Sequence, residues 1–384
     1  MSCRRLVLSV ILFALSRFPC TRGKHHSSCK FPAIYNFGDS NSDTGGISAA
    51  FYPVGPPYGE TFFHTLAGRR SDGRLIIDYF ADHLGLPLLN AYLDTFSKGY
   101  RHGANFASGG STIRAQNLSM FAGGSSPFSL DIQAAQFAQF KFRSIDLFNK
   151  TKSHSRCYRR RLPNPNDFEK ALYIFDIGQN DIAQGMEQLS HAQLIAAIPD
   201  MIKKLAASIQ NVFQQGGRTF WIHNTGPIGC LPVTLHYYHH PESGVLDENG
   251  CVKKQNEYAQ EFNKQLKRKV MEMRKQFPGA SLVYVDVYKA KFFLIGTARD
   301  HGFVDASKIC CGYHEDDTHI FCGNKGVVKG KEVYAGSCKN PASYISWDGI
   351  HYTDAANRWI ADRLSRGFFS DPPISLWKAC RHHE

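Results

Sequence analysis

The sequence lacks a hydrophobic segment long enough to cross a membrane as a helix. Such a helix needs about 20 mainly apolar residues, whereas the most apolar stretch, residues 6–15, has ten. This stretch follows two arginines and precedes a short segment that ends at Gly23, which is typical of a secretory signal peptide. We therefore predict a signal peptide over residues 1–23, a mature chain over residues 24–384 and no stable membrane anchor.

Several motifs of other protein classes are also absent. The chain has no G-x-S-x-G pentapeptide, which α/β-hydrolase lipases carry around their nucleophile. It has no H-E-x-x-H zinc motif, and the glycine-rich segment 326–331 is one residue too short for a phosphate-binding loop. No nucleic-acid-binding motif stands out either. We therefore expect no nucleic-acid partner and look for a different kind of catalytic site.

Acidic residues are few compared with basic ones. The chain has 33 Asp and Glu against 45 Lys and Arg, which gives a formal net charge of +12. Four arginines of the predicted signal peptide account for part of this surplus, and the mature chain stays basic. A basic surface suits an anionic partner such as an acidic polysaccharide or lipid headgroups. The densest basic run, residues 156–161, is interpreted as a solvated loop.

Cysteine is plentiful, and secretion decides how it is interpreted. Of eleven cysteines, two lie in residues 1–23, and the remaining nine are Cys29, Cys157, Cys230, Cys251, Cys310, Cys311, Cys322, Cys338 and Cys380. In an oxidising compartment most of them are expected to pair, with at least one left over, in an order that the sequence does not decide. Two sequons predict glycans at Asn117 and Asn149.

The cysteines near residue 310 also permit an alternative, a zinc site. Seven possible ligands fall within thirteen residues: Cys310, Cys311, His314, Glu315, Asp316, His319 and Cys322. The two histidines are five residues apart, which does not match the helical zinc motif, and a secreted chain favours disulfides. We therefore predict no metal and no cofactor.

Short apolar runs alternate with helical patterns along the chain. Runs rich in β-branched and aromatic residues predict buried strands at 33–37, 171–177, 218–223 and 281–287. Apolar residues at three- and four-residue spacing predict helices over 192–214, over 253–276 and from Thr353 or Asp354 to about Arg366. This alternation indicates an α/β fold with a mainly parallel sheet.

No linker divides the chain, so we predict one domain over residues 24–384. Two long stretches, 113–167 and 296–346, show no clear pattern of this kind. We interpret them as loops that line or cover a cleft.

Two blocks that lie far apart in the sequence supply the residues of an ester-cleaving site. The first, F-G-D-S-N-S-D-T-G-G, begins at Phe37 and places Ser40 where a predicted strand turns over. The second, D-G-I-H, places Asp348 three residues before His351. A serine hydroxyl needs a base to remove its proton during attack, and the base needs an acid to hold its tautomer. We predict Ser40, His351 and Asp348 as these three catalytic residues.

With G-A-N-F-A-S-G-G-S-T from residue 103 and G-Q-N-D from residue 178, these blocks resemble the plant GDSL esterases of the SGNH hydrolase superfamily. The resemblance covers residues 31–369 and implies a flavodoxin-like, three-layer α/β/α fold. It also implies an oxyanion hole made by the backbone N–H groups of Ser40 and Gly110 and by the side chain of Asn180.

Details of the first block resemble one branch of that family. Asn41 and Gly46 replace residues found in many members and resemble the branch with early-nodulin-like and fucosidase-named proteins. Neither position supplies a catalytic atom, so the difference concerns substrate preference. No carboxylate pair of testable spacing supports glycosidase chemistry.

We therefore expect a secreted serine esterase that hydrolyses carboxylic esters through an acyl-enzyme. The expected substrate carries short acyl groups, above all acetyl, on a cell-wall polysaccharide or a glycosylated metabolite. The expected location is the extracellular space or cell wall, with retention in the Golgi as a variant. A lipase or an acyltransferase with the same site is an alternative, and a binding or structural protein without turnover is another. The sequence leaves the oligomeric state open.

Overall fold

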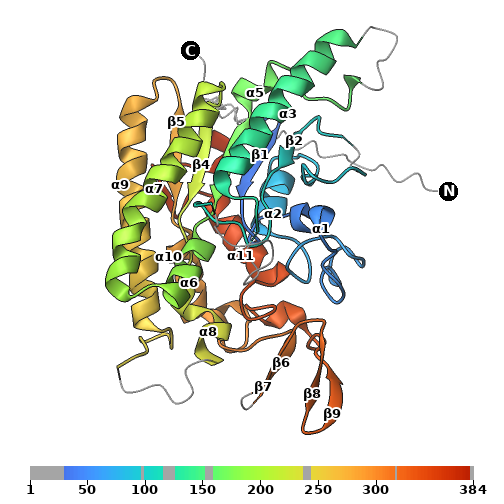
Figure 1. The fold of residues 1–384 in the computed structure, drawn as a ribbon, viewed down its shortest axis with the longest axis vertical. Helices are drawn as coiled ribbons and strands as arrows, with labels where there is room; N and C mark the ends of the chain where they lie inside the picture. Colours follow the sequence, from blue (N-terminus) through green and yellow to red (C-terminus); the bar gives the residue numbers. More distant parts are fainter. Residues whose placement is uncertain are drawn as a thin grey trace, which may run out of the picture.

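A six-stranded sheet forms the centre of the molecule (Figure 1). The computed structural model describes residues 30–96, 99–115, 126–151, 159–236, 244–315 and 318–380. The sheet has the order β10-β5-β4-β3-β1-β2. Its parallel strands are β1 (Ile34–Gly38), β2 (Gly103–Asn105), β3 (Leu172–Asp176), β4 (Thr219–His223) and β5 (Ser281–Val285), and β10 (Ser370–Asp371) is antiparallel. The four predicted strands are confirmed, whereas the short β2 and β10 were not predicted.

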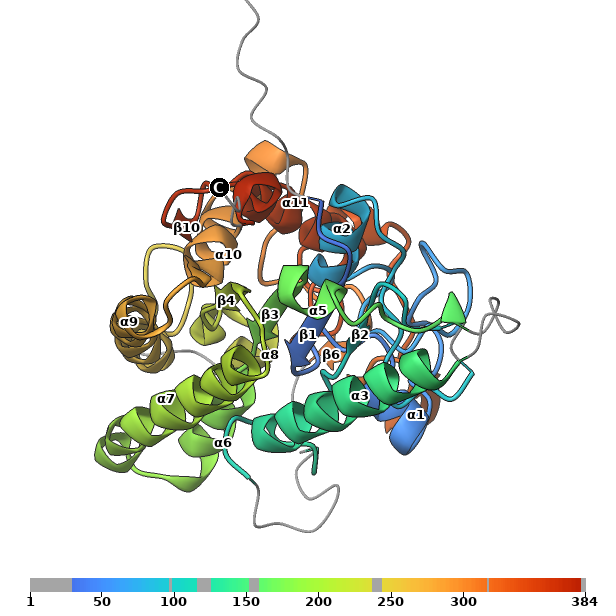
Figure 2. The same ribbon diagram turned by 90° about the horizontal axis from the view of Figure 1, so that it is seen from above.

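Helices cover both faces of this sheet, as the view in Figure 2 shows. One face carries α3 (Leu130–Lys150), α7 (His191–Gln214) and α9 (Lys253–Gln276), and the other carries α2 (Ile76–His83), α10 (Val287–Gly296) and α11 (Asp354–Ser365). The predicted three-layer α/β/α fold with a mainly parallel sheet is confirmed. None of the described helices combines the length and apolar character needed to span a bilayer.

Shorter helices lie in the connections: α1 (Gly46–Ala50), α5 (Asp167–Lys170), α6 (Gln179–Gln188), α8 (Pro232–His236) and the 3₁₀ turns Ile228–Cys230, Ala298–His301, Pro341–Ser343 and Leu376–Lys378. Two of the helices that cover the sheet, α7 and α11, begin where side chains satisfy their first N–H groups. Ser190 and Gln193 form a reciprocal capping box at α7, and the Thr353 hydroxyl accepts from the N–H of Ala356 at α11. The predicted cap at Thr353 is therefore confirmed.

The prediction that residues 113–167 form a loop was wrong, because α3 occupies 130–150. This helix packs on β1 through a buried stripe that includes Leu130, Ala134 and Phe137 at three- and four-residue spacing. The loop prediction for 296–346 was also wrong in part. Two hairpins, β6 (Gly312–Glu315) with β7 (Thr318–Phe321) and β8 (Lys325–Val328) with β9 (Lys331–Tyr334), fold there.

Disulfides account for the cysteines in the described part of the chain. The pairs are Cys230–Cys251, Cys310–Cys338 and Cys311–Cys322, and Cys380 is also disulfide-bonded. The predicted disulfides near residue 310 are confirmed, so these thiols are not available as zinc ligands. His314 and His319 instead face each other across β6 and β7, with their Nδ1 atoms 2.6 Å apart.

The secretion features lie partly outside the described residues. The predicted signal peptide, residues 1–23, and the sequon asparagine Asn117 both lie there. Asn149 is described and exposed in the last turn of α3, where a glycan would meet solvent. Glycosylation at either position stays a prediction.

Candidate active site

The first block of the sequence forms a tight turn after β1. The Asp39 N–H donates to the carbonyl oxygen of Asp176 at the end of β3 (3.3 Å). The Asp39 carboxylate then accepts from the backbone N–H of Asn41 (2.9 Å), and its carbonyl accepts from the N–H of Ser42 (3.1 Å). These bonds curl the chain around Ser40, whose side chain lies at the carboxyl end of a parallel sheet, where α/β folds place ligands.

Ser40, His351 and Asp348 form one continuous chain of hydrogen bonds. The Ser40 Oγ lies 2.8 Å from Nε2 of His351, and Nδ1 of the same imidazole lies 2.7 Å from Oδ2 of Asp348. All three side chains are buried. The fold thus brings together a serine and a histidine separated by 311 positions, in contact through the atoms that proton transfer requires.

Hydrogen bonds within the D-G-I-H block hold the side chains of Asp348 and His351 in their orientations. Oδ1 of Asp348 accepts from the backbone N–H groups of Ile350 (3.0 Å) and His351 (2.8 Å). Gly349 between them has φ = +91°, a conformation that favours glycine. Burial alone would raise the pKa of Asp348, but the adjacent His351 and these N–H donors outweigh it and hold that pKa well below its usual range.

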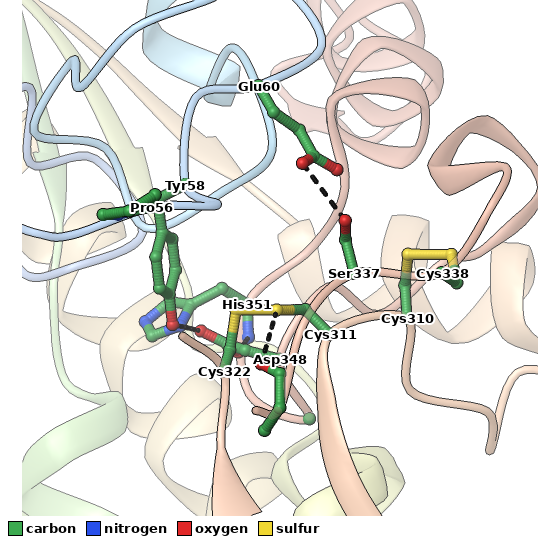
Figure 3. Close-up of a disulfide and its surroundings, with 12 residues drawn as sticks. Pro56, Tyr58, Glu60, Cys310, Cys311, Cys322, Ser337, Cys338, Asp348 and His351 are labelled. Atoms are coloured by element: carbon green, nitrogen blue, oxygen red, sulfur yellow. Dashed lines mark hydrogen bonds and ion pairs between the residues drawn. A yellow bond between two sulfur atoms is a disulfide. The ribbon is translucent and has the colours of Figure 1, made fainter. Parts of the chain in front are cut away.

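A tyrosine that the sequence did not point to joins this chain. The Tyr58 hydroxyl donates to Oδ2 of Asp348 at 2.9 Å, on the oxygen that also contacts His351 (Figure 3). Burial, followed by the nearby Asp348 charge, raises the pKa of Tyr58. The phenol therefore keeps its proton and remains a donor. Tyr58 lies in a proline-rich segment without a motif of its own, so no sequence feature marked it.

The three predicted oxyanion donors lie on segments that follow β1, β2 and β3. Within the described part of the chain, the backbone N–H groups of Ser40 and Gly110 have no hydrogen-bond acceptor. The Asn180 side chain donates to the carbonyl oxygen of Ser111 at 2.9 Å, which leaves one N–H of its amide for a ligand. Ser111 follows Gly110 directly, so Asn180 lies against the glycine-containing loop.

Two buried carboxylates accept hydrogen bonds from the loop that follows β2 and contains Gly110. Asp43 accepts from the N–H of Gly109 (2.8 Å) and also from N–H groups of its own turn, which ties the first block to the loop after β2. Asp181, next to Asn180, accepts from the N–H groups of Ile113 (2.8 Å) and Arg114 (3.2 Å). Burial raises the pKa of Asp181 to about 6, although these N–H groups lower it. Sequence reasoning gave neither aspartate this role.

A cluster of buried ionisable groups lies next to the turn that carries Ser40. Asp176 at the end of β3 contacts His223 at the end of β4, with 3.5 Å between Oδ1 and Nδ1. Burial, followed by the charge of Asp176, raises the pKa of Asp39. The buried ammonium of Lys291 lies 4.5 Å from the centre of the Tyr352 ring, and burial lowers its pKa. These surroundings therefore disfavour the charged forms of Asp39 and Lys291.

Comparison with known proteins identifies the family to which this chain is similar. The family model described as GDSL-like Lipase/Acylhydrolase matches residues 34–364. A GDSL esterase/lipase of Arabidopsis thaliana is 57% identical over 353 residues, which is 92% of this chain and 90% of that protein. An esterase of Hevea brasiliensis is 46% identical over 362 residues, covering 93% of this chain and 91% of its own.

Further matches concern the branch and the fold. A protein of Arabidopsis thaliana named alpha-L-fucosidase 3 is 46% identical over 376 residues, 96% of this chain and 98% of that protein, which agrees with the predicted branch. Among solved structures, an acetylxylan esterase from Geobacillus stearothermophilus matches with 12% identity and a TM-score of 0.38, over 93% of this chain and all of that one. From the family model and the plant relatives, we conclude that the chain belongs to the GDSL lipase/acylhydrolase family and is a carboxylic ester hydrolase.

Proposed function

We propose that this protein is a serine esterase in which Ser40 is the nucleophile and His351 is the general base. Asp348 is the carboxylate that orients His351. The observation that carries this proposal is the continuous chain of hydrogen bonds from Ser40 Oγ through the imidazole to Asp348, with distances of 2.8 and 2.7 Å. In it, Nε2 takes the serine proton as Oγ attacks the ester carbonyl. Asp348, held as a carboxylate, stabilises the imidazolium that results.

The attacked carbonyl oxygen gains negative charge, and donors already in place stabilise it. In our proposal these donors are the N–H groups of Ser40 and Gly110 and the second N–H of the Asn180 amide. The alcohol leaves with the proton from His351. A water molecule, deprotonated by the same imidazole, then attacks the acyl-enzyme, releases the acid and restores Ser40.

For the substrate, we propose a short acyl group, above all acetyl, on a cell-wall polysaccharide or a glycosylated metabolite. The basic composition of the chain suits an acidic polymer. The bonded cysteines suit passage through an oxidising secretory compartment. We propose release to the extracellular space or cell wall of a mature domain spanning residues 24–384.

The substrate proposal is tested with one purified sample and two series of esters. The first series is 4-nitrophenyl esters from acetate to palmitate, and the second is acetylated wall polysaccharides, with released acetate measured directly. We expect kcat/KM to be highest for acetate and acetate release from at least one polysaccharide. A maximum at long chains would identify a lipase. Acyl transfer to an added sugar alcohol that exceeds hydrolysis would identify an acyltransferase.

A further inference from the structure

We propose that Tyr58 is a positioning residue for Asp348 and that a disulfide-linked ribbon holds Tyr58 in place. We use the term ribbon for residues 310–315 and 318–338, which contain the hairpins β6–β7 and β8–β9. This inference rests on the proposed catalytic role of Asp348.

Four donors surround the Asp348 carboxylate, and Tyr58 differs from the other three. The N–H groups of Ile350 and His351 and the imidazole Nδ1 all belong to the D-G-I-H block itself. Tyr58 comes from a segment 290 positions away and reaches Oδ2 at 2.9 Å. Among the donors in the described part of the chain, Tyr58 is therefore the one that links this carboxylate to a segment outside its own block.

The ribbon contacts the segment around Tyr58 on both sides of that residue. The Tyr334 hydroxyl donates to the carbonyl oxygen of Pro56 at 3.3 Å. The Ser337 hydroxyl donates to the carboxylate of Glu60 at 3.1 Å (Figure 3). Gly323 approaches so closely that an added Cβ would lie 2.4 Å from the same Pro56 oxygen, so only glycine fits there. Together these contacts fix the backbone from which Tyr58 extends.

The same ribbon also forms hydrogen bonds with the two residues immediately before Asp348. The N–H of Cys310 donates to the carbonyl of Ser346 (3.1 Å), and the N–H of Cys311 donates to that of Trp347 (2.6 Å). The fully buried Trp347 meets the ring of Tyr58 edge-on, with 6.0 Å between centroids. Both partners of the Tyr58–Asp348 hydrogen bond are therefore held by one structural unit.

The disulfides close this unit where it meets the site. Cys310–Cys338 joins its two ends, and Cys311–Cys322 joins its first end to the turn after β7 (Figure 3). Three of these cysteines form a small buried cluster with Trp347, separate from the main core, and Cys338 and Tyr58 pack against this cluster. Hairpins of four-residue strands have little core of their own, so we infer that these disulfides keep the ribbon ordered.

The charges around the Tyr58 hydroxyl decide what its loss would do. The hydroxyl donates to Asp348, and the positive charge of Arg70 acts on it as well. Its hydrogen bond draws charge from the Oδ2 atom that also contacts His351. Without it, the carboxylate would hold the imidazolium more strongly, so the imidazole would stay protonated to a higher pH. The Asp348 carboxylate would also rotate more freely and hold the imidazole less firmly, which would lower kcat.

Tyr58→Phe removes only this hydroxyl, and Tyr79→Phe is its matched control. Tyr79 is also buried and donates to an aspartate outside the site, Asp354, at 2.8 Å. For Tyr58→Phe we expect kcat to fall roughly tenfold with little change in KM, as for the loss of a hydrogen bond to a charged group. The acid limb of the kcat/KM profile should move to higher pH. Tyr79→Phe should change neither.

An unchanged pH profile in Tyr58→Phe, or an equal shift in Tyr79→Phe, would overturn the positioning role. Covalent labelling of Ser40 by a fluorophosphonate in the wild-type protein keeps this test separate from the proposed function. If Ser40 is labelled and the Tyr58→Phe profile is unchanged, only the present inference fails. If Ser40 is not labelled, the proposed function itself fails.

A double-mutant cycle tests the ribbon. The pair Cys311→Ala and Cys322→Ala is made in the wild-type and in the Tyr58→Phe background, and Ser337→Ala provides a milder change that keeps both disulfides. If the ribbon acts through Tyr58, each change should lower kcat severalfold in the wild-type background and much less in Tyr58→Phe. Equal losses in both backgrounds would show that the ribbon does not act through Tyr58.

Discussion

Gly38 and Asp176, at the ends of the neighbouring strands β1 and β3, approach each other too closely for any side chain on Gly38. An added Cβ would lie 2.5 Å from the Asp176 carbonyl oxygen and 2.4 Å from the Ser42 hydroxyl. We expect Gly38→Ala to displace the nucleophile turn, to lower the free energy of unfolding by about 1–3 kcal/mol and to remove most ester hydrolysis.

The control for this change is Gly55→Ala, because an added Cβ at Gly55 meets nothing within 4 Å. Urea unfolding and turnover of 4-nitrophenyl acetate check both variants. Equal stability and turnover in Gly38→Ala and Gly55→Ala would mean that the turn tolerates the extra methyl group, contrary to the close approach.

Asp348→Asn should lower kcat by up to ~10⁴-fold, because an amide does not hold the imidazole in the tautomer that accepts the serine proton. The structure offers a matched control in a second histidine–aspartate pair. His83 Nε2, on α2, lies 3.1 Å from Asp362 Oδ1, on α11, and neither residue contacts Ser40, His351 or Asp348. Asp362→Asn should leave kcat unchanged, and steady-state kinetics would compare the two. Similar kcat values in both variants would remove Asp348 from the mechanism.

Asn180→Ala should lower kcat by roughly 10²- to 10³-fold with a smaller change in KM, because the donor acts mainly on charge that develops in the transition state. The substitution also removes the 2.9 Å bond to the Ser111 carbonyl. Thermal unfolding should therefore be recorded beside the kinetics. A rise in KM alone, with kcat preserved, would mark Asn180 as a binding residue.

Asp39→Asn should change how stability depends on pH. Burial and the neighbouring Asp176 raise the pKa of Asp39 in the folded state above the ordinary value of about 3.9. The folded protein then holds a proton that the unfolded chain releases, so ionisation lowers stability as pH rises above about 4. Asparagine carries no such penalty.

The difference in unfolding free energy between Asp39→Asn and wild type should therefore shift in favour of the variant between about pH 5 and about pH 8. Urea unfolding at the two pH values measures it. A difference that stays constant would show that Asp39 ionises as easily in the folded state as in the unfolded chain.

How much of the site could be predicted depended on whether the chemistry was local in sequence. Ser40 and the Asp348–His351 pair lie in short blocks whose residue types and spacing indicate a catalytic role. The structure brings these side chains together as predicted. Tyr58 contacts Asp348 only because the ribbon and the segment around it fold against each other. Tyr58 lies outside these blocks, so nothing in the sequence indicated its contact with Asp348, 290 positions away.

The fold shows a similar contrast. The central strands were predictable because strands covered on both faces are mostly apolar, as in β3 and β4. The hairpins β6–β7 and β8–β9 were not, because their four-residue strands are mostly half-buried or exposed and disulfides, rather than a hydrophobic face, join them to the molecule. α3 could have been found, since Leu130, Ala134 and Phe137 carry helical spacing.

The central claim is that Ser40 becomes covalently acylated during ester hydrolysis. Labelling with a fluorophosphonate probe, followed by peptide mass spectrometry, tests it most directly in the wild type and in Ser40→Ala. We expect the probe on Ser40 and nowhere else in the wild type, and we expect the folded variant to be unlabelled and inactive towards 4-nitrophenyl acetate. Wild-type turnover by folded Ser40→Ala would contradict the account.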